Sequence, residues 1–402
     1  MTLLLIVLYI TFIGLGLPDP VLGSLWTDIS ATIGTSSDMM GYINLVVIAG
    51  TAISALIVSI FPKYMKTIPV IILSIAFTII GLIGISFAQN MIWIFLFAIP
   101  LGLGGGGVDA VINNYVIIHY KPKYVTWLHC FWGIGGVGGP LLALLGSTWR
   151  EGLQFVSIAI LSVLLVFIVT LPVWAKKRQL GETELSIDER SRKLGVKSAL
   201  KTPLILVGCM CFFFMVSIEG TVFTWASSYM RESLLINKET ASIVISAFMG
   251  SYIVGRLILG FLTNYFSAKS LIRAGLVIMA IGALMGLTPH SGVFIASIII
   301  LALGLCIMYP TFSRENPHRY GLEKNQAVTA IQVVACNIGS ATMPLFVSLF
   351  LRIDGLTINI YPYFPLIFTL GLAACSELFN FKFKKVLAER EHLLRPEEAS
   401  GV

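Results

Sequence analysis

The stretch Leu101–Pro140 reads LGLGGGGVDAVINNYVIIHYKPKYVTWLHCFWGIGGVGGP. It contains two apolar, glycine-rich segments joined by a short basic link at residues 121–127. Small residues let helices approach closely in membrane bundles, so both segments suit membrane-spanning helices. Asp109 lies in the middle of the first segment, with Asn113 one helical turn later on the same face. A carboxylate at membrane depth costs ~2.5–3.5 kcal/mol on insertion scales, which makes Asp109 a candidate functional residue.

The composition of the whole chain indicates the same environment. Apolar residues make up 57% of the 402 residues, and charged residues only 12%. A water-soluble domain of this composition would have an apolar surface, whereas a segment of ~20 apolar residues can cross a bilayer. We therefore predict an all-α, polytopic membrane protein with twelve transmembrane helices. Their expected ranges are 2–24, 38–60, 68–88, 91–118, 124–148, 151–175, 203–230, 240–262, 268–287, 293–313, 322–350 and 358–381.

The net charge of +7 is unevenly distributed. Lys and Arg gather in the even-numbered connections between these helices and in the C-terminal tail, and the odd-numbered connections hold few. The positive-inside rule then predicts that both termini lie in the cytoplasm and that the protein resides in the cell membrane, in contact with lipid. The basic surplus therefore orients the chain and does not indicate a nucleic-acid partner.

A faint internal repeat divides the chain into two halves. Gly50 and Gly250 lie 200 residues apart, Leu101-Gly102-Leu103 matches Leu303-Gly304-Leu305, and Gly135 matches Gly339. We predict a six-helix bundle at 1–175, a cytoplasmic linker at 176–202, a second six-helix bundle at 203–381 and a cytoplasmic tail at 382–402. Two pseudo-symmetric six-helix bundles are typical of secondary transporters that bind their substrate between the halves.

Asp19 and His129 are candidate site residues in the first half besides Asp109 and Asn113. Asp19 lies between Pro18 and Pro20, which interrupt the first predicted helix and free backbone groups for partners or a watery cavity. The alternative for this motif is a simple kink. His129, in the fifth helix, suits hydrogen bonding to a polar substrate, or it is a satisfied structural histidine.

The second half contributes five further candidates. Glu219 falls opposite Asp19 at an offset of 200, and Trp225 lies two turns further on. Tryptophan beside a polar group suits a sugar ring, although tryptophan also packs bundles. We predict a conformational role for Arg256, near the cytoplasmic end of the eighth helix. Gln332 and Asn337 either face the cavity or hydrogen-bond between helices.

Other kinds of site have little support. The six cysteines are scattered within the predicted spans with no C-x-x-C pair, and we predict neither disulfides nor a metal site. Gly102-x-Gly104-x-x-Gly107 matches a dinucleotide fingerprint in form, but no strand precedes it, so we expect no cofactor. The H-E-x-x-H and G-x-S-x-G motifs are absent, and we do not expect an enzyme.

Three patches resemble the major facilitator superfamily, and within it the fucose permease-like branch of fucose–galactose–glucose:proton symporters. The patch GLPDPVLGSLW is similar to the first helix of that branch, where Asp19 matches a cavity acid. VDAVINNY and LHCFWGIGGVGGP are similar to the fourth and fifth helices, where Asp109 and Asn113 match an acid and an amide. SIEGTVFTWASSYM is similar to the seventh helix, where it supplies Glu219 and Trp225.

The resemblance implies proton-coupled sugar uptake by alternating access, with the two first-half acids in substrate recognition and proton coupling. There are departures from the fucose permease: the fourth-helix acid is Glu there, His129 replaces an amide, and Glu219 replaces another. The loop signature between the second and third helices is reduced to FPKYMK.

The residues themselves support a proton-coupled carrier of a small polar solute, most plausibly a sugar. Burial disfavours the ionised form of a carboxyl group, which suits Asp19, Asp109 and Glu219 to bind and release protons. Substrate contacts are expected from Asp19, Asn113, His129, Glu219, Trp225, Gln332 and Asn337. A proton-coupled exporter of drugs or amphipathic metabolites and a membrane receptor that no longer transports are the alternatives. We expect a monomer.

Overall fold

The computed structural model describes residues 2–60, 67–120, 122–172, 200–202, 204–320 and 325–394, and within these ranges all regular structure is helical. The first half comprises α1 (Thr2–Gly16), α2 (Val21–Ile33), α3 (Met39–Ile60), α4 (Thr67–Ser86), α5 (Met91–His119), α6 (Pro122–Ala143) and α7 (Trp149–Val169). The second half comprises α10 (Ile205–Glu232), α11 (Lys238–Leu262), α12 (Ala268–Gly286), α13 (Ser291–Tyr320), α14 (Asn325–Leu351), the 3₁₀ turn η2 (Ile358–Ile360) and α15 (Tyr363–Leu394). Most of the predicted linker and the end of the tail fall outside the described residues.

The all-α, membrane-spanning architecture is confirmed. Eleven stretches of the described residues are long and apolar enough to cross a membrane, and one of them, Leu3–Ile33, contains α1 and α2 together. α6 is the further helix that completes the two sets of six. Several predicted boundaries were wrong: the first span continues to Ile33 instead of residue 24, the tenth helix to Tyr320 instead of residue 313, and the last helix to Leu394 instead of residue 381.

The break between α1 and α2 follows from its sequence. Pro18 and Pro20 lack the N–H group that continues a helical hydrogen-bond ladder. Leu17 N–H still donates to Ile13 O, and the ladder resumes when Ser24 N–H donates to Pro20 O. Asp19 therefore lies in a non-helical segment halfway along a membrane-spanning stretch.

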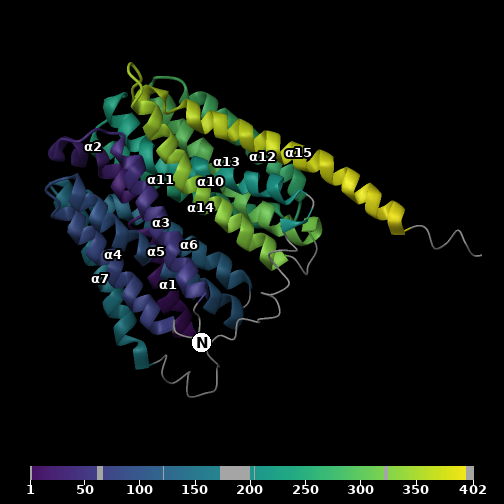
Figure 1. Ribbon diagram of the computed structural model, residues 1–402, viewed down its shortest axis with the longest axis horizontal. Helices are drawn as coiled ribbons and strands as arrows, with labels where there is room; N and C mark the ends of the chain where they lie inside the picture. Colours follow the sequence, from purple (N-terminus) through teal and green to yellow (C-terminus); the bar gives the residue numbers. More distant parts are fainter. Residues whose placement is uncertain are drawn as a thin grey trace, which may run out of the picture.

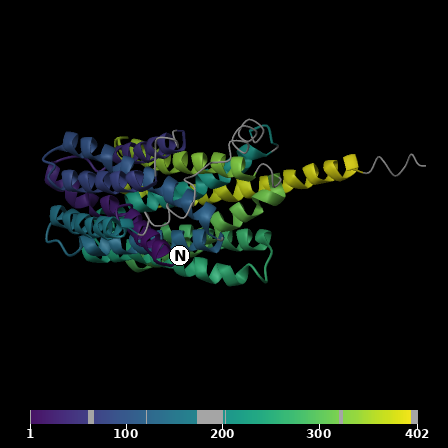
Figure 2. The ribbon, with the colours of Figure 1, turned by 90° about the horizontal axis from the view of Figure 1, so that it is seen from below.

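The two halves repeat the same packing. α1 packs on α6 as α10 packs on α14, and α3 packs on α5 as α11 packs on α13. The pairs α4–α5 and α4–α7 likewise have counterparts in α12–α13 and α12–α15. In Figure 1 the two sets of helices occupy opposite sides of the molecule, and Figures 1 and 2 both show the C-terminal part of α15 projecting beyond the bundle.

Glycine contacts establish the register of this repeat. A Cβ on Gly135 would meet Ile13 O of α1 at 2.1 Å, and one on Gly339 would meet Phe213 O of α10 at 2.5 Å, in agreement with the predicted pairing of these two glycines. The counterpart of Gly304, which packs against α12, is Gly104, which packs in the same way against α4. The predicted pairing of Gly102 with Gly304 was therefore displaced by two residues.

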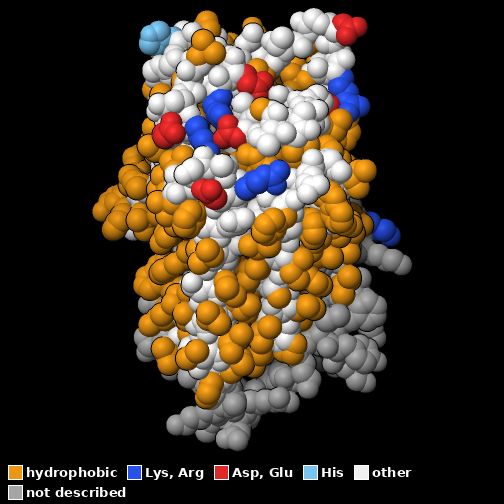
Figure 3. Space-filling model, turned by 90° about the vertical axis from the view of Figure 1, so that its left-hand side faces the viewer, with side chains coloured by type: hydrophobic (Ala, Val, Ile, Leu, Met, Phe, Trp, Pro, Cys, Tyr) orange, Lys and Arg blue, Asp and Glu red, His pale blue; other side chains and the backbone are white. Residues whose placement is uncertain are grey.

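The outside of the bundle is suited to lipid. Large hydrophobic side chains are exposed on helices of both halves, among them Ile92, Val169 and Leu206. Figure 3 shows one face on which hydrophobic side chains cover most of the surface while charged groups gather near one end. In water such an apolar surface would be unfavourable, whereas in a bilayer it faces apolar lipid.

Candidate functional site

Asp19 is the acid at the helix break, and it is exposed to solvent. Its Oδ2 accepts a hydrogen bond from Nε1 of Trp132, on α6, at 2.8 Å. The close packing of α1 on α6 makes this contact possible, because a Cβ on Gly16 would lie 2.0 Å from the carbonyl oxygen of Trp132. Gly16 of α1 and Gly135 of α6 thus bring the two helices close enough for the indole to reach the carboxylate.

Asp109 is the partly buried acid of α5. Its Oδ1 accepts a hydrogen bond from Nδ2 of Asn113, one turn further along the same helix, at 2.8 Å. An electrostatic interaction also links Asp109 to Tyr309 of α13, in the other half. Asp109 therefore lies near the interface between the halves.

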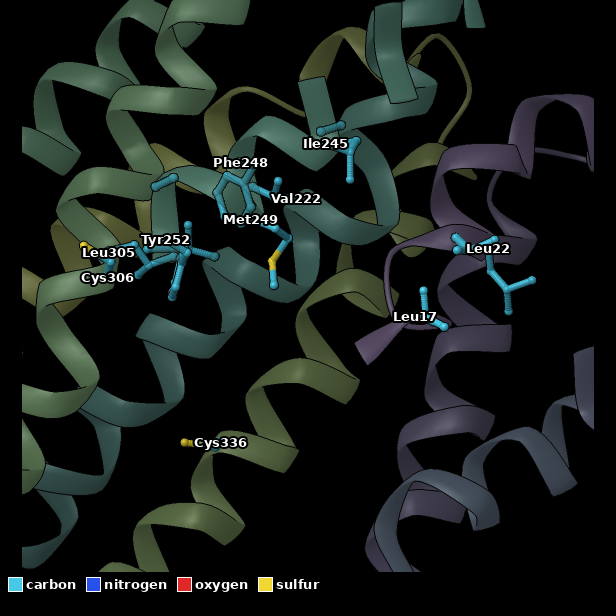
Figure 4. Close-up of a cluster of buried hydrophobic side chains, with 14 of the residues drawn as sticks. Leu17, Leu22, Val222, Ile245, Phe248, Met249, Tyr252, Leu305, Cys306 and Cys336 are labelled. Carbon is cyan, nitrogen blue, oxygen red and sulfur yellow. The ribbon is translucent and has the colours of Figure 1, made fainter. Parts of the chain in front are cut away.

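Glu219 is the acid of α10, and α11 supplies its neighbours. The hydroxyl of Tyr252 donates to Oε2 of Glu219 at 3.3 Å. The guanidinium carbon of Arg256 lies 4.9 Å from the centre of the Tyr252 ring, and an electrostatic interaction links Arg256 to Glu219. Figure 4 shows Tyr252 beside Leu305 and Cys306, in an otherwise apolar cluster.

Some of these groups lie within range of Coulomb interactions. The Asp19 carboxylate is near enough to those of Glu219 and Asp109 to be affected by their charges, although the three lie on different helices. His129 is likewise affected by the charge of Arg256 and has the ring of Phe12 at 6.0 Å, edge-on. Asp19 is exposed to solvent, and we call the solvent-accessible space around it the wet passage.

Two predicted substrate contacts, Trp225 and Gln332, have their polar groups bonded within the second half. Trp225 is fully buried, and its Nε1 donates to Pro344 O at 3.0 Å, which ties α10 to α14. Gln332 is also buried and exchanges hydrogen bonds of 2.6 and 3.0 Å with Asn316. Asn337, one turn beyond Gln332, is partly buried. Trp225 and Gln332 use their polar groups in helix packing, which was the alternative interpretation of each.

Arg256 lies in the C-terminal turns of α11, the end that we predicted for it. Its charge also acts on Glu219 and His129, which the sequence did not indicate. Its Nε is buried and has no hydrogen-bond partner among the described residues. The expected conformational role thus belongs to a residue inside the polar group.

Sequence reasoning missed Trp132 and Tyr252 as partners of the acids. Trp132 lies in the quoted patch LHCFWG, only three residues after His129, and its position beside the first helix could have been read from the glycines around it. Tyr252 lies one turn before Arg256 in α11, and no motif marks it.

Ion pairs join the halves at the end of the bundle that carries the loops 34–38, 233–237 and 352–357, which we call the Asp38 end. Asp28 of α2 pairs with Arg231 and, at 3.2 Å, with Lys238. Asp38 accepts from Nε of Arg352 at 2.6 Å. In each pair the first half supplies the acid and the second half the base.

Closer to the middle of the bundle, hydrogen bonds and small residues continue the contact between the halves. Nδ2 of Asn44 on α3 donates to Ser340 O on α14 at 2.8 Å, and Oγ of Ser227 on α10 donates to Ser24 O at 3.1 Å. α6 and α11 touch where Met249 packs on Gly136. The halves are thus held together from the Asp38 end to the middle of the bundle.

Among the described residues, no group of three or more His, Cys, Asp or Glu side chains could hold a metal ion. All six cysteines are free.

Comparison with known proteins identifies the family. The sequence profile of the Major Facilitator Superfamily matches residues 4–234 and 210–385. The chain belongs to this superfamily. The family consists of transporters and not of enzymes, and it implies a small-molecule substrate and a multi-pass membrane protein.

Relatives and structural neighbours agree with this assignment. "Bypass of stop codon protein 6" of Saccharomyces cerevisiae is 23% identical over 327 residues, 74% of this chain, and the chain spans 65% of that protein's length. An uncharacterized MFS-type transporter of Schizosaccharomyces pombe is 36% identical over 70 residues, 16% of this chain and 12% of that protein.

Two solved structures show the shared fold. A bacterial homolog of the human lysosomal transporter Spinster, in an inward-facing and occupied conformation, has a TM-score of 0.73 at 15% identity and covers 95% of this chain and 96% of its own. A D-xylose–proton symporter has a TM-score of 0.67 at 15% identity, with coverages of 92% and 96%. These neighbours share the superfamily fold, and the fucose permease-like branch is not among them.

Proposed function

We propose that the protein is a proton-coupled secondary transporter of a small polar solute, most plausibly a sugar, that works by alternating access. The observation that carries the proposal is the position of Asp19: an exposed carboxylate at a helix break, in electrostatic contact with Asp109 of its own half and Glu219 of the other. A solute bound there touches both halves, and its binding can bias their relative position.

Proton coupling rests on the surroundings of the first-half acids. Asp19 accepts from the neutral indole of Trp132, and Asp109 accepts from the neutral amide of Asn113. Among the residues that the structure describes, neither Asp19 nor Asp109 forms an ion pair. A carboxylate with only neutral donors inside a membrane protein is costly when charged, so protonation offers a low-energy alternative.

The preference for a sugar rests on the pairing of aromatic rings with carboxylates. The half-buried Trp132 presents an indole beside Asp19, whereas the ring of Tyr252 beside Glu219 is buried. An aromatic face next to a hydrogen-bond acceptor fits the apolar face and the hydroxyl groups of a pyranose. One structural neighbour transports D-xylose with protons, and this lends the preference the support of a shared fold.

The orientation follows from the basic connections. We infer that both termini lie in the cytoplasm and that the Asp38 end faces outside the cell membrane. We also infer that the monomer suffices for transport, because both halves of the site belong to one chain.

The test uses purified protein in proteoliposomes that contain a pH-sensitive dye. A panel of neutral sugars is added outside under an inward proton gradient, beside hydrophobic cations as probes of the exporter alternative. We expect a sugar to drive proton entry and to accumulate. Proton movement driven only by the hydrophobic cations would favour an exporter, whose apolar contacts Phe248 and Met249 are adjacent to Tyr252.

Asp109→Asn is the decisive variant. It should lose proton-driven accumulation while it still exchanges solute between the two sides. Asp354→Asn, which removes an exposed carboxylate of the loop after α14, is the matched control and should behave as the unaltered protein. Accumulation by Asp109→Asn against a gradient would show that Asp109 does not couple transport to protons.

A further inference from the structure

A pocket of about 470 Å³ lies at the Asp38 end, away from the three acids of the transport site. Its walls come from both halves: the loop between α2 and α3 on one side, and the end of α10, the end of α14 and η2 on the other. Neither Asp19, Asp109 nor Glu219 lines it. The pocket is therefore a second site candidate, distinct from the wet passage.

One wall is acidic and rich in hydroxyl groups. The lining contains two carboxylates, Asp38 and Glu232, and no basic side chain. Asp38 is buried and already paired, because Arg352 donates to its Oδ2 at 2.6 Å. Asp38 thus has limited capacity for a ligand.

Glu232 differs from Asp38 in this respect. It is exposed, and its two oxygens accept from Oγ of Ser37 at 3.1 and 3.3 Å. Arg231 influences Glu232 electrostatically, but its guanidinium contacts Asp28. The hydroxyl of Thr27 also lies near Glu232. A carboxylate oxygen has about two acceptor positions, so Glu232 retains acceptor capacity in the pocket.

The lining also contains apolar side chains. Leu351, Leu356 and Ile358 line the pocket from the end of α14, the loop that follows it and η2. A ligand that meets both the acidic and the apolar side chains needs a hydrogen-bond donor and an apolar body. A positively charged donor makes the stronger bond to a carboxylate.

We propose that this pocket binds an organic primary amine with an apolar body, in which the ammonium group donates to Glu232 and the apolar body packs on Leu351 and Ile358. All three of these contacts belong to the second half, and Ser36 and Ser37 of the first half also line the pocket. An amine enclosed between the halves stabilises the closed arrangement of this end and opposes the return of the carrier to its outward-open state.

The experiment compares three probes of one shape on the purified protein in lipid nanodiscs: tryptamine, its neutral analogue tryptophol, and the anion indole-3-propionate. Calorimetry should give saturable binding of tryptamine and at least about tenfold weaker binding of the other two, since a hydrogen bond to a charged group is worth ~1.5–3 kcal/mol. Equal binding of tryptamine and tryptophol would overturn the proposal, because the charge would then have no role.

Four variants locate the site. Glu232→Gln should weaken tryptamine binding at least about tenfold, and Glu239→Gln, an exposed acid of α11 that does not line the pocket, should leave it unchanged. Thr357→Trp fills the pocket from its rim without removing any ion pair between the halves, and it should abolish binding. Asp19→Asn should leave binding unchanged. If Asp19→Asn removes binding and Glu232→Gln does not, the amine occupies the transport site and the proposal is wrong.

Hydrogen exchange supplies a readout of the closed state. Bound tryptamine should slow amide exchange both in residues 34–38 and in residues 352–360, which belong to different halves. Protection of one segment alone would contradict a site shared between the halves. None of these measurements requires transport, so their outcome is independent of whether the proposed function is correct.

Discussion

The first helix of each half has an acid at matching positions, Asp19 and Glu219, 200 residues apart, and the two acids lie in different surroundings. The first-half helix is broken by Pro18 and Pro20, and its acid is exposed. Its counterpart α10 runs unbroken from Ile205 to Glu232, with Ile218 and Gly220 in place of the prolines, and its acid is partly buried. The repeat thus supplies two acids, and the local sequence makes only one of them directly accessible to water.

Their partners also come from different helices. Asp19 receives its hydrogen bond from Trp132 of α6, and the repeat places Cys336 at the corresponding point of α14. Glu219 receives its hydrogen bond from Tyr252 of α11, and the corresponding residue of α3 is Ala52. The backbone packing of the halves is symmetric while the polar side chains are not, so the acid of one half is exposed to solvent and the acid of the other is partly buried beside Tyr252.

The most direct test of this difference is to neutralise Asp19 and Glu219 in turn. Asp19→Asn should reduce transport to the background of empty vesicles, because it removes the exposed acid at the centre of the passage. Glu219→Gln should lower kcat/KM about tenfold, the value of one hydrogen bond to a charged group. Uptake of labelled solute measures both. Equal losses in the two variants would mean that the acids are equivalent despite their surroundings.

A second prediction concerns the close packing that brings Trp132 to Asp19. A Cβ on Gly139 would lie 2.0 Å from Leu17 O, next to the helix break. Gly139→Ala should therefore lower the free energy of unfolding by ~1–3 kcal/mol through overpacking. The control is Gly138→Ala, whose Cβ would meet only the end of the Leu17 side chain, at 3.4 Å. Thermal unfolding in detergent compares them, and equal midpoints would contradict the proposed close contact of α1 and α6.

A third pair of variants removes single donors and keeps the rings. Trp132→Phe deletes the indole N–H that bonds Asp19, and Tyr252→Phe deletes the hydroxyl that bonds Glu219. We expect roughly a tenfold loss of kcat/KM for Trp132→Phe, whose bond of 2.8 Å is the shorter. Tyr252→Phe should lose less, because its bond is 3.3 Å and Arg256 remains near Glu219. A larger effect at Tyr252 would reverse the assigned roles of the two halves.

The smallest expected effect concerns the ion pairs, in which the halves also differ by carrying opposite charges. Arg352 pairs with Asp38, and its side chain is 48% exposed. Arg352→Gln leaves Asp38, whose side chain is only 7% exposed, without its base, so it should lower the free energy of unfolding by ~1–2 kcal/mol. Asp28→Asn should cost more, because it leaves Arg231 and Lys238, 16% and 17% exposed, without their carboxylate. Thermal unfolding at low and high salt measures both, and a larger effect for Arg352→Gln would be inconsistent with these exposures.

Much of this structure could be predicted. Long apolar segments leave the chain no arrangement in a bilayer other than helices, because each backbone polar group needs a partner within its own segment. The prolines around Asp19 gave the position of the break, and the recurring glycines indicated the two halves. The errors concern the register of the repeat, such as the pairing of Gly102 with Gly304, and the ends of helices. Most positions of a membrane span are apolar, so their pattern defines neither the register nor the helix ends.

The site was predicted less completely, and particular residues show why. A charge inside an apolar segment is visible in the sequence, so Asp19, Asp109 and Glu219 were found. A tryptophan or an amide occurs both in cavities and in contacts between helices, and the sequence does not distinguish the two. Trp225 and Gln332 were therefore assigned to the cavity, although their polar groups bond within the helix packing. The neighbours Trp132 and Tyr252 carry no charge, and their importance comes from the acids that they meet.

Local chemistry was thus enough to establish that the chain spans a membrane as helices, where one helix breaks, and which carboxylates lie at membrane depth. Those properties depend on the cost of transferring single groups out of water, and each residue pays that cost wherever it lies. Folding in three dimensions decided which indole meets Asp19, that Arg256 joins the acids, and which end of the bundle is held closed. Such pairings link residues more than a hundred positions apart, and they arise only when the packing of small residues between helices has set the distances.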